Sequence, residues 1–216
     1  IKNIRANRSK PGLRLQHLVG LQALSEITNS TLSECKVGTE VISLYPKQTI
    51  KESIKVEIAT AGSVGLLLQP IQIACLGFHE PEKIVVFING GGSFGKWAPS
   101  LDYLKGVTYQ IFKNLGFNIE IDIQKHGFYP KGGAMVKCTL HPPKNMLKPI
   151  LLTELGKIDL IRGEITITNQ LKRNKVGERI KTSVLNQLKK NMQTDININY
   201  KYVDSLSPGV GLSLCA

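Results

Sequence analysis

The chain has 216 residues, of which 42% are hydrophobic, and its net charge is +12. This apolar content can build one sizeable core, or a core with a smaller second domain. No apolar run approaches the roughly 20 residues that cross a bilayer, and no secretory leader is recognisable, so we expect a cytoplasmic protein with no membrane partner. The positive charge favours a polyanion such as nucleic acid, although a solvated basic surface has the same composition.

The first part of the chain predicts a strand at 2–7, a helix at 13–28, and strands near 32–36 and 40–45. This order resembles the second half of the unit that follows it. We therefore expect an upstream segment before residue 1, which is Ile and not Met.

The middle of the chain predicts a complete strand-helix-strand-helix-strand-strand unit. Its strands are expected at 54–59, 83–88, 117–124 and 134–140, and its helices at 62–78 and 100–115. A glycine-rich loop at 89–99 follows the second strand, and the loop 126–133 joins the last two strands.

The pattern changes after residue 148. We expect strands at 148–153 and 158–168 with a turn at Gly156, a basic amphipathic helix at 175–192, and strands near 194–203 and 209–215. The last strand ends on an apolar sequence, and an unprotected sheet edge is a liability, so we expect a downstream segment as well.

Cysteine and histidine positions argue against a metal site. The four cysteines are far apart and form no CxxC pair, and the four histidines are scattered. We read the cysteines as small buried apolar residues and predict no metal ligands within this chain.

The helix at 62–78 is a candidate binding element. Gly62, Gly65, Gln69 and Gln72 recur at helical spacing and share one face, so a ligand could approach the helix N-terminus and meet the amide of Gln69. Close helix packing on glycine, with Gln69 bonded internally, explains the same pattern. The residues alone leave both interpretations open.

Arginines gather at the start of the chain. Arg5 and Arg8 precede a Pro-Gly turn that leads into the helix carrying Arg14 and His17. Guanidinium groups near a helix N-terminus are a plausible phosphate clamp, while solvated strand-end charges are the alternative. A lone histidine among leucines, such as His17, is more often structural than catalytic.

Two loops combine glycine, proline and aromatic residues. In the loop 89–99, Trp97 and Pro99 could cover a nucleobase or simply pack the loop down, and the glycines do not form a Walker phosphate loop. In the loop 126–133 (HGFYPKGG), glycine allows close approach of the backbone and aromatic rings can stack on bases, although a hairpin turn uses the same residues.

Taken together, the motifs resemble the RNA 3′-terminal phosphate cyclases along the whole chain. The stretches that carry the resemblance are IRANR to QHL (4–18), TAGS to LQ (60–69), GGS to P (91–99) and HGFYP with GG (126–133). The resemblance implies an α/β (α+β) fold, in which repeated βαβαββ units form a larger domain at 1–159 whose first unit is truncated. An inserted, smaller α/β domain would begin at 160 and be incomplete at 216.

The implied reaction converts an RNA 3′-phosphate into a 2′,3′-cyclic phosphate with ATP and a divalent metal, Mg or Mn, through a covalent histidine-AMP intermediate. Splitting the transfer in this way turns one difficult step into easier ones. By resemblance, Gln69 and Pro99 fall on ATP-binding positions, and Arg5, Arg8 and His17 on positions that line the RNA and phosphate side. The nucleophilic histidine is expected outside this chain, so residues 1–216 alone are predicted to be inactive.

The sequence departs from the family pattern in three places. Gly-Gly-Thr-Asp is replaced by Gly-Gly-Ser93-Phe94, and the third glycine of the last motif is Ala134, where we expect no left-handed backbone. The acidic N-terminal motif with its metal-binding glutamate also has no counterpart. The alternatives are a non-catalytic cyclase-like protein of ribosomal RNA maturation, an enolpyruvyl-transferase-like enzyme of small molecules, and a bare RNA-binding module.

Overall fold

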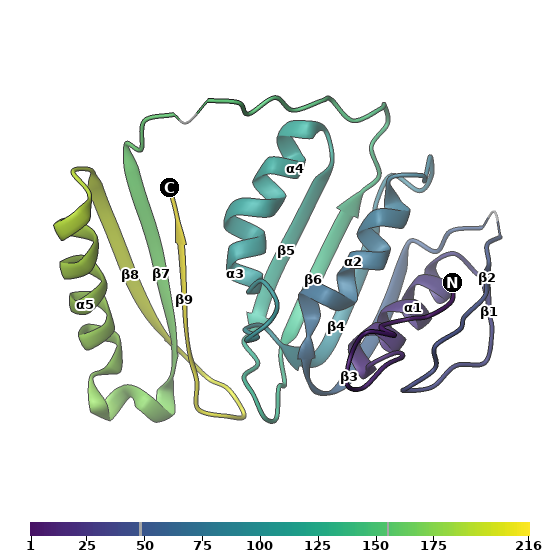
Figure 1. Cartoon of the computed structure of the whole chain (residues 1–216), viewed down its shortest axis with the longest axis horizontal. Helices are drawn as coiled ribbons and strands as arrows, with labels where there is room; N and C mark the ends of the chain where they lie inside the picture. Colours follow the sequence, from purple (N-terminus) through teal and green to yellow (C-terminus); the bar gives the residue numbers. More distant parts are fainter. Residues whose placement is uncertain (48, 155) are drawn as a thin grey trace.

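The protein is a mixed α/β structure with two separate sheets and a short two-stranded ribbon, as predicted for its class. The computed structural model describes residues 1–47, 49–154 and 156–216. In Figure 1 the larger sheet and its helices lie on one side, the smaller sheet lies on the other, and a long connecting segment crosses between them. The division into domains at residue 160 stays a prediction, and the smaller sheet begins at that residue.

The larger sheet has the strand order β3-β4-β6-β5. Its strands are β3 (Ser53–Ser63), β4 (Ile84–Gly92), β5 (Asn118–Lys125) and β6 (Met135–His141). β3 and β4 are parallel, while β6 is antiparallel to both β4 and β5. The parallel pair needs a crossover, which the helix α2 (Val64–Cys75) supplies. This is the strand-helix-strand-helix-strand-strand unit predicted from the sequence.

One face of this sheet is covered and the other is exposed. Ile54, Val56 and Ile58 of β3 are buried, and the residues between them are exposed, because side chains alternate across a strand. The helices α1 (Leu15–Ile27) and α2 pack against the buried face and against each other. At their contact a Cβ on Gly20 would lie 2.9 Å from the carbonyl oxygen of Leu67, so glycine permits this close approach.

The second crossover is a helical stretch in three parts: α3 (Leu101–Tyr103), the π-helical turn η1 (Leu104–Thr108) and α4 (Tyr109–Leu115). Gly116 ends it with a φ of 101°, a left-handed conformation in which glycine is favoured. The extent of the predicted helix at 100–115 is confirmed, but the π-helical turn inside it was not predicted.

The N-terminal segment corrects one prediction. Residues 2–7 form turns instead of a strand, because Asn3 and Arg5 have left-handed φ values of 56° and 54°. The segment bonds to residues 38–42: the amide of Ile4 donates to the carbonyl of Glu40 at 3.1 Å, and the amide of Ile42 donates to the carbonyl of Ile1 at 2.9 Å. These bonds also shorten the predicted strands to the ribbon β1 (Thr31–Leu32) and β2 (Leu44–Tyr45).

The strand predicted at 148–153 is also wrong. Within the described chain these residues have no sheet partner, and Leu151 and Leu152 are exposed by 83% and 78%. The apolar run that suggested a strand is therefore part of the connecting segment. The cysteines divide in two: Cys75 and Cys138 are buried as expected, whereas Cys35 and Cys215 are half-buried.

The smaller sheet has the strand order β8-β7-β9. Its elements are β7 (Leu160–Thr168), the 3-10 turn η2 (Asn169–Asn174), α5 (Val176–Asn191), β8 (Asp195–Val203) and β9 (Val210–Cys215). Ile165, Ile167 and Ile198 form its small core under the apolar side of α5. Among the described residues, no helix combines the length and the apolar character that a bilayer crossing requires.

Candidate active site

The four motif stretches converge at the carboxyl ends of the parallel strands β3 and β4. A Cβ on Gly132 would lie 2.8 Å from the carbonyl oxygen of Thr60 and 2.7 Å from that of Gly91, so the loop 126–133 abuts both strand ends. A Cβ on Gly62 would lie 3.4 Å from Cβ of Gln16, which places the start of α1 at the same edge. Ligands of open α/β sheets gather at this edge.

Glycine is required where the ends of β3 and β4 pair with each other. Gly90 has a φ of 92°, and a Cβ there would lie 2.0 Å from the carbonyl oxygen of Ile58. β4 extends through Gly92, so the first part of the predicted loop 89–99 is strand. Ala134 has no left-handed φ, as predicted.

His126 and Ser93 form a buried structural pair beneath the loop. Nδ1 of His126 lies 3.1 Å from the Ser93 hydroxyl, which also donates to the carbonyl of Gly127 at 3.2 Å and accepts from its amide at 3.2 Å. His126 and Ser93 are 4% and 2% exposed. Because both side chains bond within the loop, neither is free to attack a ligand.

The aromatic residues of the two loops divide into packed and exposed groups. Phe128 stacks on Phe94, with ring centroids 5.3 Å apart and planes at 8°, so its ring is unavailable to a base. Trp97 and Tyr129 are 88% and 82% exposed. Trp97 and Tyr129 are therefore the aromatic rings of these loops that are open to solvent.

Gln69 and Pro99 lie close to each other. Both line a cavity of about 470 Å³ between α2 and the helical stretch α3–α4, whose other walls are mainly apolar and include Leu104 and Phe112. Gln69 is exposed, whereas the buried glutamine is Gln72, whose amide donates to the Tyr109 hydroxyl at 2.6 Å. The interpretation as a binding face therefore applies to Gln69, whose side chain is open to solvent. The interpretation as internal packing applies to Gln72, whose side chain is bonded inside the protein.

Arg5 and His17 lie together at the start of α1. Nη1 of Arg5 donates to the carbonyls of Lys10 and Gly12 at 2.9 and 3.0 Å, and so closes the preceding turn. Nδ1 of His17 accepts the amide of Arg14 at 3.2 Å and caps the helix. Burial, followed by the charges of Arg5 and Arg14, lowers the pKa of His17 and favours its neutral form.

Arg8 is exposed on the same turn, and no described residue bonds to its side chain. The start of α1 does not line the cavity that holds Gln69 and Pro99. The structure thus places the predicted residues in two groups, one beside the apolar cavity and one at the helix start.

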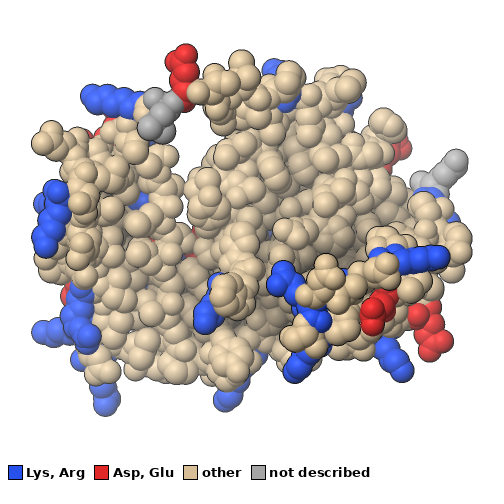
Figure 2. All heavy atoms as spheres, in the orientation of Figure 1, with Lys and Arg blue, Asp and Glu red and all other residues tan. Residues whose placement is uncertain are grey.

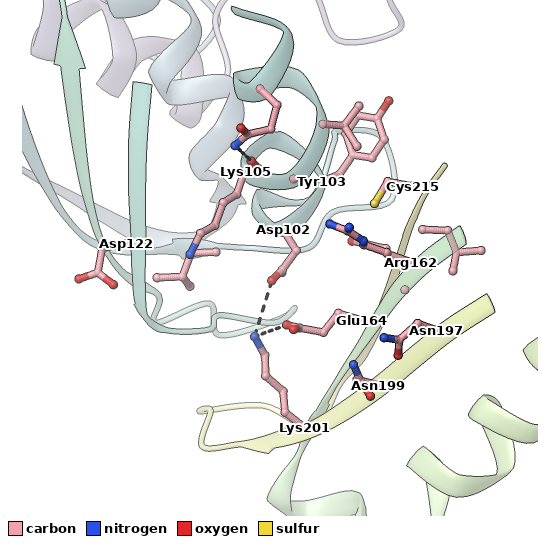
Figure 3. A pocket seen from close by; sticks show the side chains of 17 residues that line it. Asp102, Tyr103, Lys105, Asp122, Arg162, Glu164, Asn197, Asn199, Lys201 and Cys215 are labelled. Atoms are coloured by element: carbon pink, nitrogen blue, oxygen red, sulfur yellow. Dashed lines mark hydrogen bonds and ion pairs between the residues drawn. The ribbon is translucent and has the colours of Figure 1, made fainter. Parts of the chain in front are cut away.

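A second cavity, of about 680 Å³, lies between the two sheets and was not predicted. Figure 3 shows Glu164 and Lys201 of the smaller sheet pointing toward Asp102 of α3. Nζ of Lys201 lies 3.8 Å from Oδ1 of Asp102 and pairs with Glu164. Arg162 and Asn197, which face each other in the β7–β8 register, line the same cavity.

Asp102 connects this cavity to the buried histidine. Its Oδ2 atom lies 3.8 Å from Nδ1 of His126, is buried, and has no hydrogen-bond partner within the described chain. Burial lowers the pKa of His126 and is the largest effect, and the charge of Lys201 lowers it further. The charges of Asp102 and Glu164 raise the pKa, but the net change is a decrease. His126 is therefore held neutral.

Sequence reasoning missed this second group because its members come from distant parts of the chain. Asp102 lies in a helix, while Glu164 and Lys201 lie on two strands of the other sheet. The available signal was alternation: Asn197, Asn199 and Lys201 occupy every second position of β8 and therefore share a face. Nothing in the sequence indicated which surface that face would meet.

Comparison with known proteins agrees with the motifs. A family model described as RNA 3′-terminal phosphate cyclase matches residues 1–207. RNA 3′-terminal phosphate cyclases of Thermococcus gammatolerans and Thermococcus onnurineus are each 35% identical over 216 residues, which is all of this chain and 60% and 61% of those proteins. That of Thermococcus sibiricus is 42% identical over 163 residues, 76% of this chain and 45% of that protein.

The chain thus spans about 60% of the length of the first two relatives. The match covers the four motif stretches that meet at the edge of the larger sheet and continues into the smaller sheet. The chain therefore belongs to the RNA 3′-terminal phosphate cyclase family.

Proposed function

We propose that this polypeptide is part of an ATP-dependent RNA 3′-phosphate cyclase, a cytoplasmic enzyme of RNA processing in the ligase class. Its substrate would be RNA with a 3′-phosphate end, and its product the 2′,3′-cyclic phosphate. The family membership over residues 1–207 is the observation that carries the proposal. ATP would supply the adenylyl group that makes a phosphate oxygen a good leaving group.

The cavity beside α2 fits the adenine end of ATP. Its walls are mainly apolar, and the exposed Gln69 has a donor and an acceptor that no described residue occupies. Pro99 could cover the ring from the other side. We therefore propose that Gln69 and Pro99 hold ATP.

The start of α1 is the proposed phosphate side. Arg8 is exposed, and Arg5 holds the turn next to the neutral His17. Guanidinium groups at a helix start suit phosphate oxygens. The divalent ion, Mg or Mn, is part of the proposal, but no three His, Cys, Asp or Glu side chains gather among the described residues, so we assign it no ligand.

ATP binding is tested with a fluorescent ATP analogue on residues 1–216. Gln69→Ala should weaken binding about tenfold, since a hydrogen bond to a charged or buried ligand group contributes about 1.5 kcal/mol. Gln187→Ala, an exposed glutamine on α5, is the matched control and should leave binding unchanged. Equal effects of both variants would reject the assignment of this cavity.

Catalysis is tested with RNA that carries a labelled 3′-phosphate, whose cyclised product resists phosphatase. We propose that residues 1–216 form no covalent AMP adduct alone and that activity requires a chain as long as the relatives, of which residues 1–216 span about 60%. A stable label from α-phosphate-labelled ATP on residues 1–216 would contradict the first statement. Failure of the longer chain to cyclise would favour the non-catalytic alternative.

A further inference from the structure

The smaller sheet carries a concentration of positive charge that the proposed function does not use. Residues 169–191 contain seven Lys and Arg residues and one acidic residue, Glu178, so their net charge is +6, half of that of the whole chain. We call these seven residues the helix patch: Lys172, Arg173, Lys175, Arg179, Lys181, Lys189 and Lys190. They lie on η2, on α5 and at the junction between the two.

The charges of the helix patch are not balanced by the protein. Within the described part of the chain, none of the seven cations forms an ion pair. The carboxylate of Glu178 instead accepts hydrogen bonds from the hydroxyls of Tyr200 and Tyr202 at 3.3 and 3.2 Å. Lys175 directly precedes α5, where the positive end of the helix dipole disfavours a cation. A fold that tolerates this repulsion gains from an anionic partner.

The helix patch faces outward because the opposite side of α5 is used for packing. Val176, Ile180, Val184 and Leu188 pack against the core of the smaller sheet. In Figure 1 α5 lies at the edge of the molecule, with the smaller sheet between it and the larger one. Figure 2 shows Lys and Arg side chains projecting along that edge.

The surface also has the shape and the donors for a nucleic-acid backbone. Arg173, Lys175 and Arg179 line a shallow groove of about 690 Å³ together with Thr182 and Asn186. Lysine and arginine neutralise phosphates, while hydroxyl and amide groups bond to phosphate and sugar oxygens. Glu178 also lines the groove, but its carboxylate is engaged by the hydroxyls of Tyr200 and Tyr202, so the three cations outnumber the one acidic group.

We propose that the helix patch binds the phosphate backbone of the RNA substrate upstream of its 3′ end. The proposal rests on the proposed function, because it assumes that the 3′ end lies at the edge of the larger sheet. The smaller sheet separates α5 from that edge, so a few terminal nucleotides would reach the first site alone. A longer strand would occupy both.

The test measures binding of residues 1–216 to fluorescent RNAs of about 4 and about 20 nucleotides, both with a 3′-phosphate. The variant Arg173→Gln, Lys175→Asn and Arg179→Gln removes three cations, and Asn is chosen because Lys175 has a left-handed φ of 47°, which Asn tolerates. Affinity for the long RNA should fall about tenfold. The slope of log affinity against log salt concentration should become shallower by about 2, because each of the three lost phosphate contacts on a single strand contributes about 0.7. Affinity for the short RNA should stay unchanged.

Two variants separate the helix patch from charge in general. Lys83→Gln, Lys144→Gln and Lys148→Gln remove the same charge beside a cavity at the end of the larger sheet and should leave both affinities unchanged. Arg173→Lys with Arg179→Lys keeps the charge and should keep most of the binding. Circular dichroism establishes that each variant is folded.

The proposal is overturned if the three-cation helix variant binds the long RNA as tightly as the parent, or if the control triple loses as much. The proposed function fails by a separate result, namely equal binding of RNAs that end in a 3′-phosphate and in a 3′-hydroxyl. If the three-cation helix variant loses long-RNA binding but the protein shows no preference for a 3′-phosphate, the helix patch is supported as an RNA-binding surface. The same result would reject RNA with a 3′-phosphate end as the substrate.

Discussion

The two sheets of this protein are stabilised in contrasting ways. The larger sheet buries a single cluster of twenty-three apolar residues, so its own core can hold it together. Among the residues that the structure describes, the smaller sheet has three fully buried core residues, Ile165, Ile167 and Ile198, and it relies on the half-buried side of α5. It also depends on the larger region, where Phe94 and Phe128 fill the space over Gly211 and Gly209.

The contrast extends to function. The larger region carries the family motifs, in loops whose backbone is fixed by buried hydrogen bonds. The smaller region carries the helix patch, whose cations are exposed, except for the half-buried Lys181, and form no ion pair among the described residues. The large core of the larger sheet thus holds the motif loops in fixed positions. The smaller sheet, with its small core and basic surface, suits a partner that binds by charge.

The largest expected effect is at the paired ends of β3 and β4 in the larger region. Gly90→Ala places a Cβ on a residue with a left-handed backbone and pushes it against the carbonyl of Ile58. Backbone strain and overpacking together should destabilise the fold by about 4 kcal/mol. Gly106→Ala is the control, since no atom lies within 4 Å of its Cβ position. Chemical denaturation measures the free energy of unfolding of both variants. Equal stability of the two would contradict the close contact between Gly90 and Ile58.

The next effect tests whether the two regions unfold separately. Ile167→Ala should cost about 3 kcal/mol, because it removes one of three fully buried residues of the smaller core. Hydrogen exchange should then speed up in β7, β8 and β9 and stay slow in the larger sheet. Equal acceleration of hydrogen exchange in both sheets would show that they unfold as one cooperative unit. Ile73→Ala is the control: its site is 71% exposed, so it should change neither the stability nor the exchange rates.

A smaller effect is expected at the polar pair inside the larger core. Gln72→Leu leaves the buried Tyr109 hydroxyl without a partner and should cost about 2 kcal/mol. Adding Tyr109→Phe removes that hydroxyl, so the double variant should lose less than the two single variants together. Additive losses in thermal or urea unfolding would contradict a direct bond.

The smallest effect is a pH dependence at the junction of the regions. The folded state lowers the pKa of His126, mainly by burial, so below its ordinary value of 6.5 the unfolded chain binds more protons than the folded one. Stability should therefore be complete above about pH 6.5 and fall as the pH drops toward the folded pKa. His126→Asn should flatten part of the melting temperature profile between pH 7 and pH 5, and His17, with its lowered pKa, should account for a further part.

Two charge variants sharpen this prediction, because they act on the pKa of His126 in opposite directions. Asp102→Asn removes a charge that raises the pKa and should lower it further, whereas Lys201→Met removes a charge that lowers the pKa and should raise it. Histidine NMR titration measures both. Shifts of the same sign would mean that the two side chains do not act on His126 by charge.

Sequence reasoning identified residues that the structure brings together where their signals were local. The glycines at 90–92 and 132–133, Gln69 and Pro99 were all identified from motif and spacing, and the last two share a cavity. The strands predicted at 2–7 and 148–153 were wrong because apolar alternation does not reveal whether a sheet partner exists. In the first case left-handed residues and bonds to 38–42 replaced the strand.

The sequence by itself determined the βαβαββ unit, the basic helix and the family, because alternation, helical periodicity and glycine motifs are properties of neighbouring residues. The tertiary structure decided which glutamine is open and which is buried, since Gln69 and Gln72 differ only in what packs beside them. It also decided the meeting of Asp102, His126 and Lys201, which come from separate elements. Such contacts depend on how the two sheets pack, and packing is set by the whole fold and not by any local pattern.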